Sequence, residues 1–160
     1  MLPHEHLIIG VIFSAIIFFI FPSIGAVEIL LIILSTTLID VDHYIYYAVK
    51  KRDLNLIRAY KWYQSNRAKT HHLSRKEKSK IYLGFHFFHG IEILIIIYLL
   101  YHYIHQIFLY VLIGYSLHFF ADIFVEVVGC GKTHKISVIY SFLRGRKLKF
   151  IDDIELPFRI

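Results

Sequence analysis

The chain has 160 residues, of which 57% are hydrophobic and 19% are charged. Average soluble domains carry about 45–50% apolar and about 25% charged residues, so this composition favours one lipid-embedded domain over a water-soluble one. The single cysteine, Cys130, excludes an internal disulfide.

Four apolar stretches, taken in chain order, predict four membrane-spanning helices, since a spanning helix needs about 20 mostly apolar residues. Pro22 and Gly25 enforce a turn between the first two. The second reaches full length only by including the polar segment 40–43. We therefore expect the first two helices to form a short hairpin that tilts or thins the bilayer, with a re-entrant pair as the alternative. The predicted spans are roughly residues 5–21, 26–48, 82–101 and 104–128.

The basic residues are confined to two segments, and this distribution predicts the orientation. Eleven of the 18 Lys and Arg lie in residues 50–80, and seven lie in residues 132–159. The positive-inside rule places both segments in the cytoplasm, and with four spans the N-terminus lies there too. The predicted fold class is an all-α integral membrane bundle of about four helices in the cell membrane. Its transmembrane metal-binding domain covers residues 1–131, including the basic loop, and its cytoplasmic tail covers residues 132–160.

Ionisable side chains recur at one end of every predicted span. Such groups are costly at membrane depth unless they are paired or bind a metal, so each is a functional candidate. In a four-span topology they all reach the cytoplasmic half of the bundle, which is how helix bundles build metal sites. The predicted metal ligands are His4 and His6 in the first span, Asp40, Asp42 and His43 in the second, His86 and His89 in the third, and His118 and Asp122 in the fourth.

Taken singly, these residues have simpler interpretations. A membrane histidine is often a hydrogen-bonding residue between helices, and His118 with Asp122 is also consistent with an ordinary pair one helical turn apart. Asp40 and Asp42 are also consistent with helix-end residues near water. The shared depth of all four groups favours a metal site, and mixed histidine and carboxylate ligands suit zinc best, with manganese or iron as alternatives.

Two motifs resemble a known family. Leu38-Ile39-Asp40-Val41-Asp42-His43 resembles the L-[LP]-D-x-D-H segment of the YdjM-like membrane-bound metal-dependent hydrolases. Gly114-Tyr115-Ser116-Leu117-His118-Phe119-Phe120-Ala121-Asp122 resembles their G-Y-x-x-H-x-x-x-D segment. The third span departs from the family's H-R-G-x-T-H-S, because this chain has His86, His89 and Glu92 at a different spacing. The H-x-x-x-D spacing is also similar to that of zinc-dependent phospholipase C and related nucleases, an analogy only.

The predicted function is a metal-dependent hydrolase of a phosphoester, in a lipid or a lipid-linked substrate. Glu92 or Asp42 is the candidate general base, because some carboxylate must stay free to take a proton. The competing hypothesis is that Glu92 is itself a metal ligand, or that it only forms a hydrogen bond with a ligating histidine. The rival function is a non-enzymatic metal-binding membrane protein, either an ion transporter or an assembly subunit. The apolar far halves of the first and third spans, residues 14–21 and 93–101, favour a one-sided site over a channel.

The remaining predicted partners are membrane lipids. The basic loop 50–80 is expected to meet anionic headgroups, or alternatively a phosphorylated substrate. Aromatic residues interleave with the bases there, but we expect no nucleic-acid partner.

Overall fold

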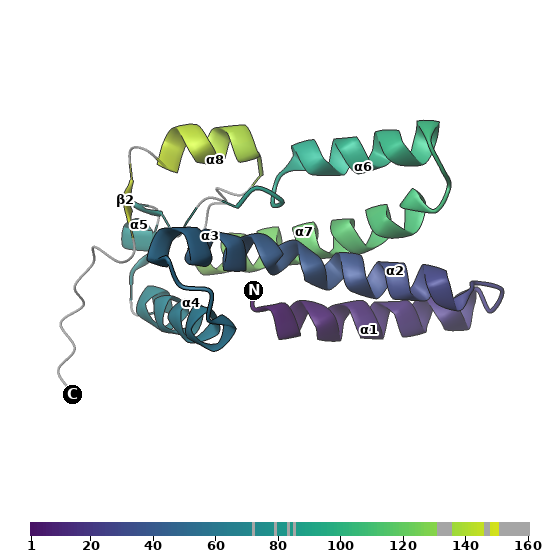
Figure 1. Cartoon of the computed structure of the whole chain (residues 1–160), viewed down its shortest axis with the longest axis horizontal. Helices are drawn as coiled ribbons and strands as arrows, with labels where there is room; N and C mark the ends of the chain where they lie inside the picture. Colours follow the sequence, from purple (N-terminus) through teal and green to yellow (C-terminus); the bar gives the residue numbers. More distant parts are fainter. Residues whose placement is uncertain are drawn as a thin grey trace.

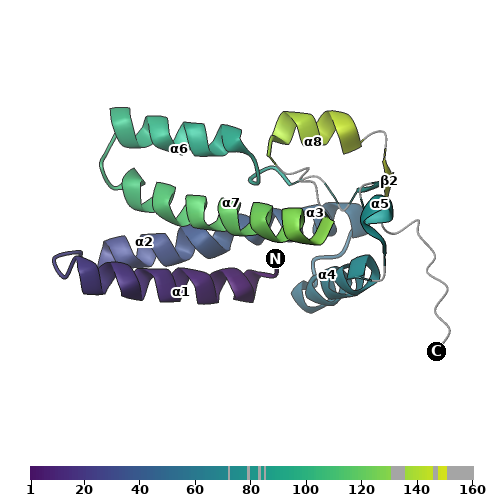
Figure 2. The same ribbon diagram turned by 180° about the vertical axis from the view of Figure 1, so that it is seen from behind.

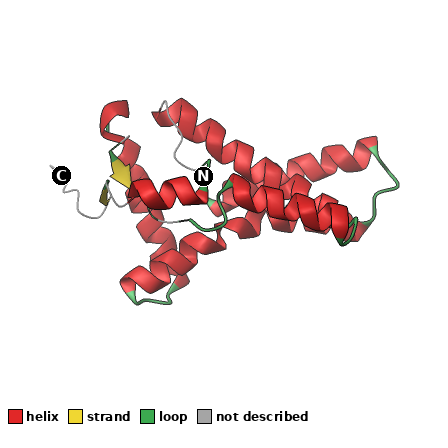
Figure 3. Cartoon of the chain, turned by 90° about the horizontal axis from the view of Figure 1, so that it is seen from above, coloured by secondary structure: helices red, strands yellow, loops and turns green. Residues whose placement is uncertain are grey.

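The computed structural model describes residues 1–71, 73–78, 80–82, 84, 86–130, 136–145 and 148–150. The described residues are almost entirely helical, which confirms the predicted all-α class (Figure 1; Figure 3). The helices are α1 (Pro3–Ile20), α2 (Ala26–Thr37), the 3-10 helix η1 (Leu38–Asp40), α3 (Val41–Lys51), α4 (Leu56–His71), α5 (Arg75–Lys78), α6 (Ile91–Tyr103), α7 (Phe108–Cys130) and α8 (Val138–Gly145). Two short strands, β1 (Ile81–Tyr82) and β2 (Lys149–Phe150), pair in parallel with Ile81 opposite Lys149.

Four helices, α1, α2, α6 and α7, run side by side and form the bundle (Figures 1 and 2). Helix α2 packs against both α1 and α7, and α7 also packs against α6. The loops α1–α2 and α6–α7 lie at one end of the bundle, which we call the loop end. Helices α3, α4, α5 and α8 lie at the opposite end, which we call the polar end. A small apolar core of Ile39, Ile97, Tyr115 and Phe119 lies within the bundle.

Two stretches of the described chain are long and apolar enough to cross a membrane: α1 and residues Phe108–Gly129 of α7. Many of their large apolar side chains are exposed, for example Ile12 and Phe124, which is typical of a surface that meets lipid or another protein. Helix α6 is apolar but has only 13 residues, about 20 Å at 1.5 Å per residue. A crossing by all four helices stays a prediction.

The predicted second span is divided, because the chain tightens into η1 between α2 and α3. The hydroxyls of Ser35, Thr36 and Thr37 each bond to the carbonyl of the residue four positions earlier, at 2.6, 2.7 and 2.9 Å. Hydroxyls that bond back to the helix in this way often bend it. Asp40, the last residue of η1, is buried at the polar end.

Glycines let α2 approach its neighbours closely. A Cβ at Gly114 of α7 would overlap the Ile32 carbonyl oxygen and the Ser35 hydroxyl of α2. A Cβ at Gly10 of α1 would lie 3.2 Å from the Thr36 Cβ. Small residues at such crossings are typical of helices that pack in membranes. The Thr36 hydroxyl lies 3.2 Å from the Gly114 carbonyl, which fixes the register of α2 against α7.

The turn from α3 to α4 is built around Asp53. Arg52 ends α3 in the left-handed conformation, at φ 53°. The Tyr47 hydroxyl donates to Asp53 Oδ2 at 2.7 Å. That hydrogen bond, together with the Asn55 amide, holds the pKa of Asp53 below its usual range. Helix α4 packs against α3 and lies near the N-terminal end of α1 (Figures 1 and 2).

Candidate metal centre

Histidine and aspartate side chains from α1, η1, α3, α7 and the segment before α6 meet at the polar end of the bundle. His6 comes from the start of α1, and Asp40 comes from η1 at the end of α2. His86 and His89 lie in the turns that precede α6. Except for His43, which is partly exposed, all members of this group are buried. We call the group the His/Asp cluster; it comprises His6, Asp40, Asp42, His43, His86, His89, His118 and Asp122.

The central pair is His89 with His118, whose Nε2 atoms lie 3.0 Å apart. His118 Nδ1 lies 2.8 Å from the Thr36 carbonyl oxygen, an atom that only accepts, so Nδ1 carries the proton. His89 Nδ1 lies 3.0 Å from Asp42 Oδ2, which assigns its proton in the same way. In neutral rings both Nε2 lone pairs therefore face each other. This arrangement is repulsive unless a cation or an extra proton lies between them.

Carboxylate oxygens complete the surroundings of this pair. Asp40 Oδ1 lies 3.3 Å from His89 Nε2 and 3.7 Å from His118 Nε2. Asp122 Oδ2 lies 3.7 and 3.9 Å from the same two nitrogens. Ligands about 2.0–2.1 Å from a tetrahedral ion lie roughly 3.3 Å from one another. The shortest of these spacings equals that ligand-to-ligand distance and the longest, 3.9 Å, exceeds it by about 0.6 Å, so a small movement would form a metal's ligand shell.

His6 extends this inner part of the cluster. Its ring stacks on His118 with centroids 3.7 Å apart, and its Nε2 lies 3.3 Å from Asp122 Oδ1. The side chain is fully buried, and among the described residues neither ring nitrogen has a hydrogen-bond partner. Buried polar atoms are rarely left unpaired. His6, His118 and Asp122 form one group able to hold an ion, with ligand atoms within 4.8 Å of one another.

A second, outer part of the cluster surrounds His43 and His86. Their Nδ1 atoms lie 2.6 Å apart, and Asp42 Oδ1 lies 3.8 Å from the first and 4.0 Å from the second. Asp42 Oδ1 has no hydrogen-bond partner among the described residues. The His43 side chain is 13% exposed, whereas that of His6 is 0% exposed. The outer part is therefore the more solvent-accessible side of the cluster.

Asp40 and His89 link the two parts. His43 Nε2 lies 3.2 Å from Asp40 Oδ1, and Asp40, His43 and His89 form a further group able to hold an ion. Asp40 Oδ2 has no hydrogen-bond partner among the described residues. Asp42 meanwhile accepts from His89 through Oδ2 and presents Oδ1 to the outer part. A carboxylate that orients a ligating histidine in this way is a common feature of metal sites.

The segment that carries His86 and His89 is held by Tyr115. Its hydroxyl lies 2.6 Å from the Phe88 carbonyl oxygen and 2.8 Å from the Gly90 carbonyl oxygen. The Phe88 amide donates to Asp42 Oδ2 at 2.8 Å. Sequence reasoning assigned no role to Tyr115, although the tyrosine of the G-Y-x-x-H segment was a signal. It also missed Thr36, whose contribution is a backbone carbonyl without any side-chain signature.

The structure does not bring His4 to the cluster. His4 is exposed, and its Nδ1 lies 3.3 Å from the Tyr60 hydroxyl of α4. Residues two apart on an α-helix point about 200° apart, so only one of His4 and His6 is able to face the bundle. His6 takes the inward position.

The structure also places the Glu92 carboxylate outside the cluster. It accepts hydrogen bonds from the Ser137 hydroxyl, from the Val138 amide at 3.0 Å and from the Ile139 amide at 3.4 Å. Glu92 thus caps the N-terminus of α8, where amide groups lack helical partners. Asp42, the other candidate base, lies within the cluster.

No protein-family model matches the chain, and neither a curated protein nor a solved structure does. The resemblance to the YdjM-like hydrolases therefore rests on the two motifs. What the fold defines is a helical bundle with two helices apolar enough to cross a membrane and a buried His/Asp cluster able to hold a metal ion.

Proposed function

We propose that this protein is a membrane-embedded metal-dependent hydrolase that cleaves a phosphoester in a lipid or a lipid-linked substrate. The observation that carries the proposal is the facing Nε2 pair of His89 and His118, whose Nδ1 protons are committed to Asp42 and Thr36. This pair lies among carboxylate oxygens at the spacing of metal ligands. Zinc suits the donor set best, with manganese or iron as alternatives.

A bound divalent ion would supply positive charge and Lewis acidity for phosphoester hydrolysis. The chain supplies the proton acceptor, and we assign that role to Asp42. Its Oδ2 is held by Phe88 and His89, which fixes the carboxylate, and its Oδ1 stays open toward the outer part of the cluster. Glu92 is less suited, because its oxygens already accept from α8.

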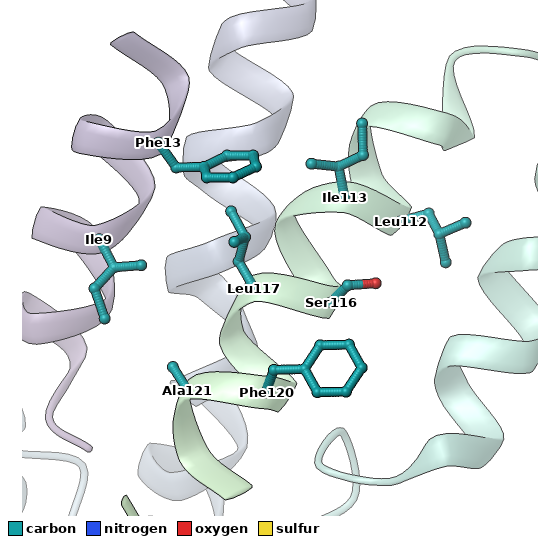
Figure 4. A pocket seen from close by; sticks show the side chains of 8 residues that line it. All are labelled: Ile9, Phe13, Leu112, Ile113, Ser116, Leu117, Phe120 and Ala121. Atoms are coloured by element: carbon teal, nitrogen blue, oxygen red, sulfur yellow. The ribbon is translucent and has the colours of Figure 1, made fainter. Parts of the chain in front are cut away.

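An apolar pocket supports a lipid substrate. The pocket has a volume of about 490 Å³ and is formed by α1 and α7 (Figure 4). Among its lining side chains, only that of Ser116 is polar. One end of the pocket is formed by Ala121, the residue before Asp122 of the cluster. An acyl chain in this pocket would keep the phosphoester of its headgroup near the polar end.

We also propose that all four bundle helices cross the cell membrane, with the polar end in the cytoplasm. The Lys and Arg of residues 50–80 and 132–159 support this orientation through the positive-inside rule. A cysteine introduced at Gln64, an exposed position of α4, is expected to react with a membrane-impermeant maleimide only after the cells are opened. Labelling in intact cells would contradict the orientation.

Asp42→Asn tests the assignment of the proton acceptor. The substitution preserves size but removes the basic oxygen, so turnover is expected to fall by about 10²–10⁴-fold. Turnover would be measured on phospholipids and lipid phosphates in mixed micelles, with bound metal quantified in the same samples. Glu92→Gln is the comparison variant, and its turnover is expected to stay close to wild type.

An equal loss of turnover in Glu92→Gln would contradict the choice of Asp42. A wild-type protein that binds metal but is inactive on the whole panel would favour the non-enzymatic alternative, an ion transporter or an assembly subunit.

A further inference from the structure

We infer that the inner face of α4 binds the phosphoryl group of the substrate, with the Asn66 amide as a hydrogen-bond donor and Arg67 as the positive charge. The inference rests on the proposed function, because it names the element that recognises the substrate's anionic headgroup. The ligand is identified by its chemistry: a phosphate monoester or diester whose oxygens only accept hydrogen bonds.

Two contacts place this face of α4 against the His/Asp cluster. The Tyr63 hydroxyl donates to the His43 carbonyl at 2.8 Å, and the two rings lie 5.2 Å apart. One helical turn later, Arg67 Nη1 donates to both oxygens of Glu5, at 2.9 and 3.0 Å. His43 is a cluster residue and Glu5 precedes another, His6, so both contacts lie beside the cluster.

Asn66 lies between these contacts and has an unused donor. Residues 63, 66 and 67 share one face of a helix, because positions three and four apart are neighbours. The Asn66 residue is only 4% exposed, and its Nδ2 has no hydrogen-bond partner among the described residues. A buried amide donor without an acceptor is unfavourable, so a ligand that supplies a hydrogen-bond acceptor would be stabilised at this position.

The positive charge of α4 favours an anion as the ligand that supplies this acceptor. Helix α4 contains Arg58, Lys61, Arg67 and Lys69, and no Asp or Glu. The described hydrogen bonds of Arg67 use Nη1 only, which leaves further guanidinium donors for a phosphoryl oxygen. Asn66 and Arg67 therefore offer donors on the face of α4 that contacts His43 and Glu5, and the His43 side chain is partly exposed there.

The test is phosphate binding by the full-length, zinc-loaded protein in detergent, measured by isothermal titration calorimetry with inorganic phosphate. Loss of a hydrogen bond to a charged group typically lowers affinity about 10–100-fold, and this is the loss expected for Asn66→Ala. Asn66→Asp preserves the size of the side chain and places a negative charge against the ligand, so the loss is expected to be at least as large. Gln64→Ala, an exposed amide on the outer face of α4, is expected to bind phosphate like wild type. Zinc content, measured on each sample, is expected to be unchanged.

Phosphatidic acid in mixed micelles, titrated in parallel, distinguishes the source of the phosphate. Weaker micelle binding by Asn66→Asp would assign the site to a lipid headgroup, and unchanged micelle binding would assign it to a soluble phosphate.

Phosphate affinity equal to wild type in Asn66→Asp, with normal zinc content, would overturn the inference, as would a wild type that binds no phosphate. Phosphate binding that depends on Asn66 in a protein without turnover would contradict the hydrolase and leave this site standing. Turnover that is the same in the wild type and in the Asn66 variants would support the hydrolase and contradict this phosphate site.

Discussion

His118→Ala is expected to remove most of the bound metal. Its Nε2 lies 3.0 Å from that of His89, and its Nδ1 is held by the Thr36 carbonyl, so the ring is oriented to donate to an ion. Loss of a residue that only supports a ligand costs about 10–100-fold in metal affinity, and loss of a ligand itself is expected to cost more. Metal content after dialysis, measured by inductively coupled plasma mass spectrometry, checks the result.

His102→Ala is the matched control, because His102 is exposed and lies in the last turn of α6 near the loop end. Its metal content is expected to equal that of the wild type. Unchanged metal in His118→Ala would remove the inner part of the cluster as a metal site. Loss of metal in both variants would instead indicate general misfolding.

Gly114→Ala is expected to destabilise the fold and to weaken metal binding together. The added Cβ would overlap the Ile32 carbonyl oxygen, a backbone atom that is unable to rotate away, so α7 and α2 must separate. Overpacking of this kind typically costs about 1–3 kcal/mol. The same movement pulls His118 away from the Thr36 carbonyl that orients it. Thermal unfolding in detergent and metal content would be measured on the same preparation.

Gly129→Ala provides the control on the same helix, since nothing lies within 4 Å of a Cβ built there. Its stability is expected to match that of the wild type or to rise slightly, because alanine favours the helix over glycine. A Gly114→Ala variant as stable as Gly129→Ala would show that the close approach of α2 to α7 does not support the fold.

The positions of the ionisable residues within the apolar stretches predicted most of the groups that meet, with His4 and Glu92 as the exceptions. His89 and His118 are 29 positions apart in the chain, yet an up-and-down bundle brings the start of one helix beside the end of the next. That geometry follows from helix direction alone, so the polar end and the cluster residues are accessible to sequence reasoning. The choice between His4 and His6 was also accessible, because helical residues two apart face different ways.

Other features depend on contacts that leave no pattern in the sequence. The second span is divided at η1, directly after hydroxyl groups that bond back to α2, and a hydropathy pattern does not report such bonds. The position of Glu92 depends on α8, whose N-terminus follows more than 40 residues later. The polar contacts of Tyr63 and Arg67, which help to hold α4, leave no pattern in the sequence, so the burial of Asn66 was visible only in the structure.

Anomalous X-ray scattering from crystals grown without chelator tests the metal site most directly. Data collected on either side of the zinc, manganese and iron absorption edges would locate an ion and identify it. We expect an anomalous peak between His89 Nε2 and His118 Nε2, within ligand distance of Asp40 and Asp122. A map without such a peak, in which the two imidazoles remain 3.0 Å apart, would assign the extra positive charge to a proton and contradict the metal centre.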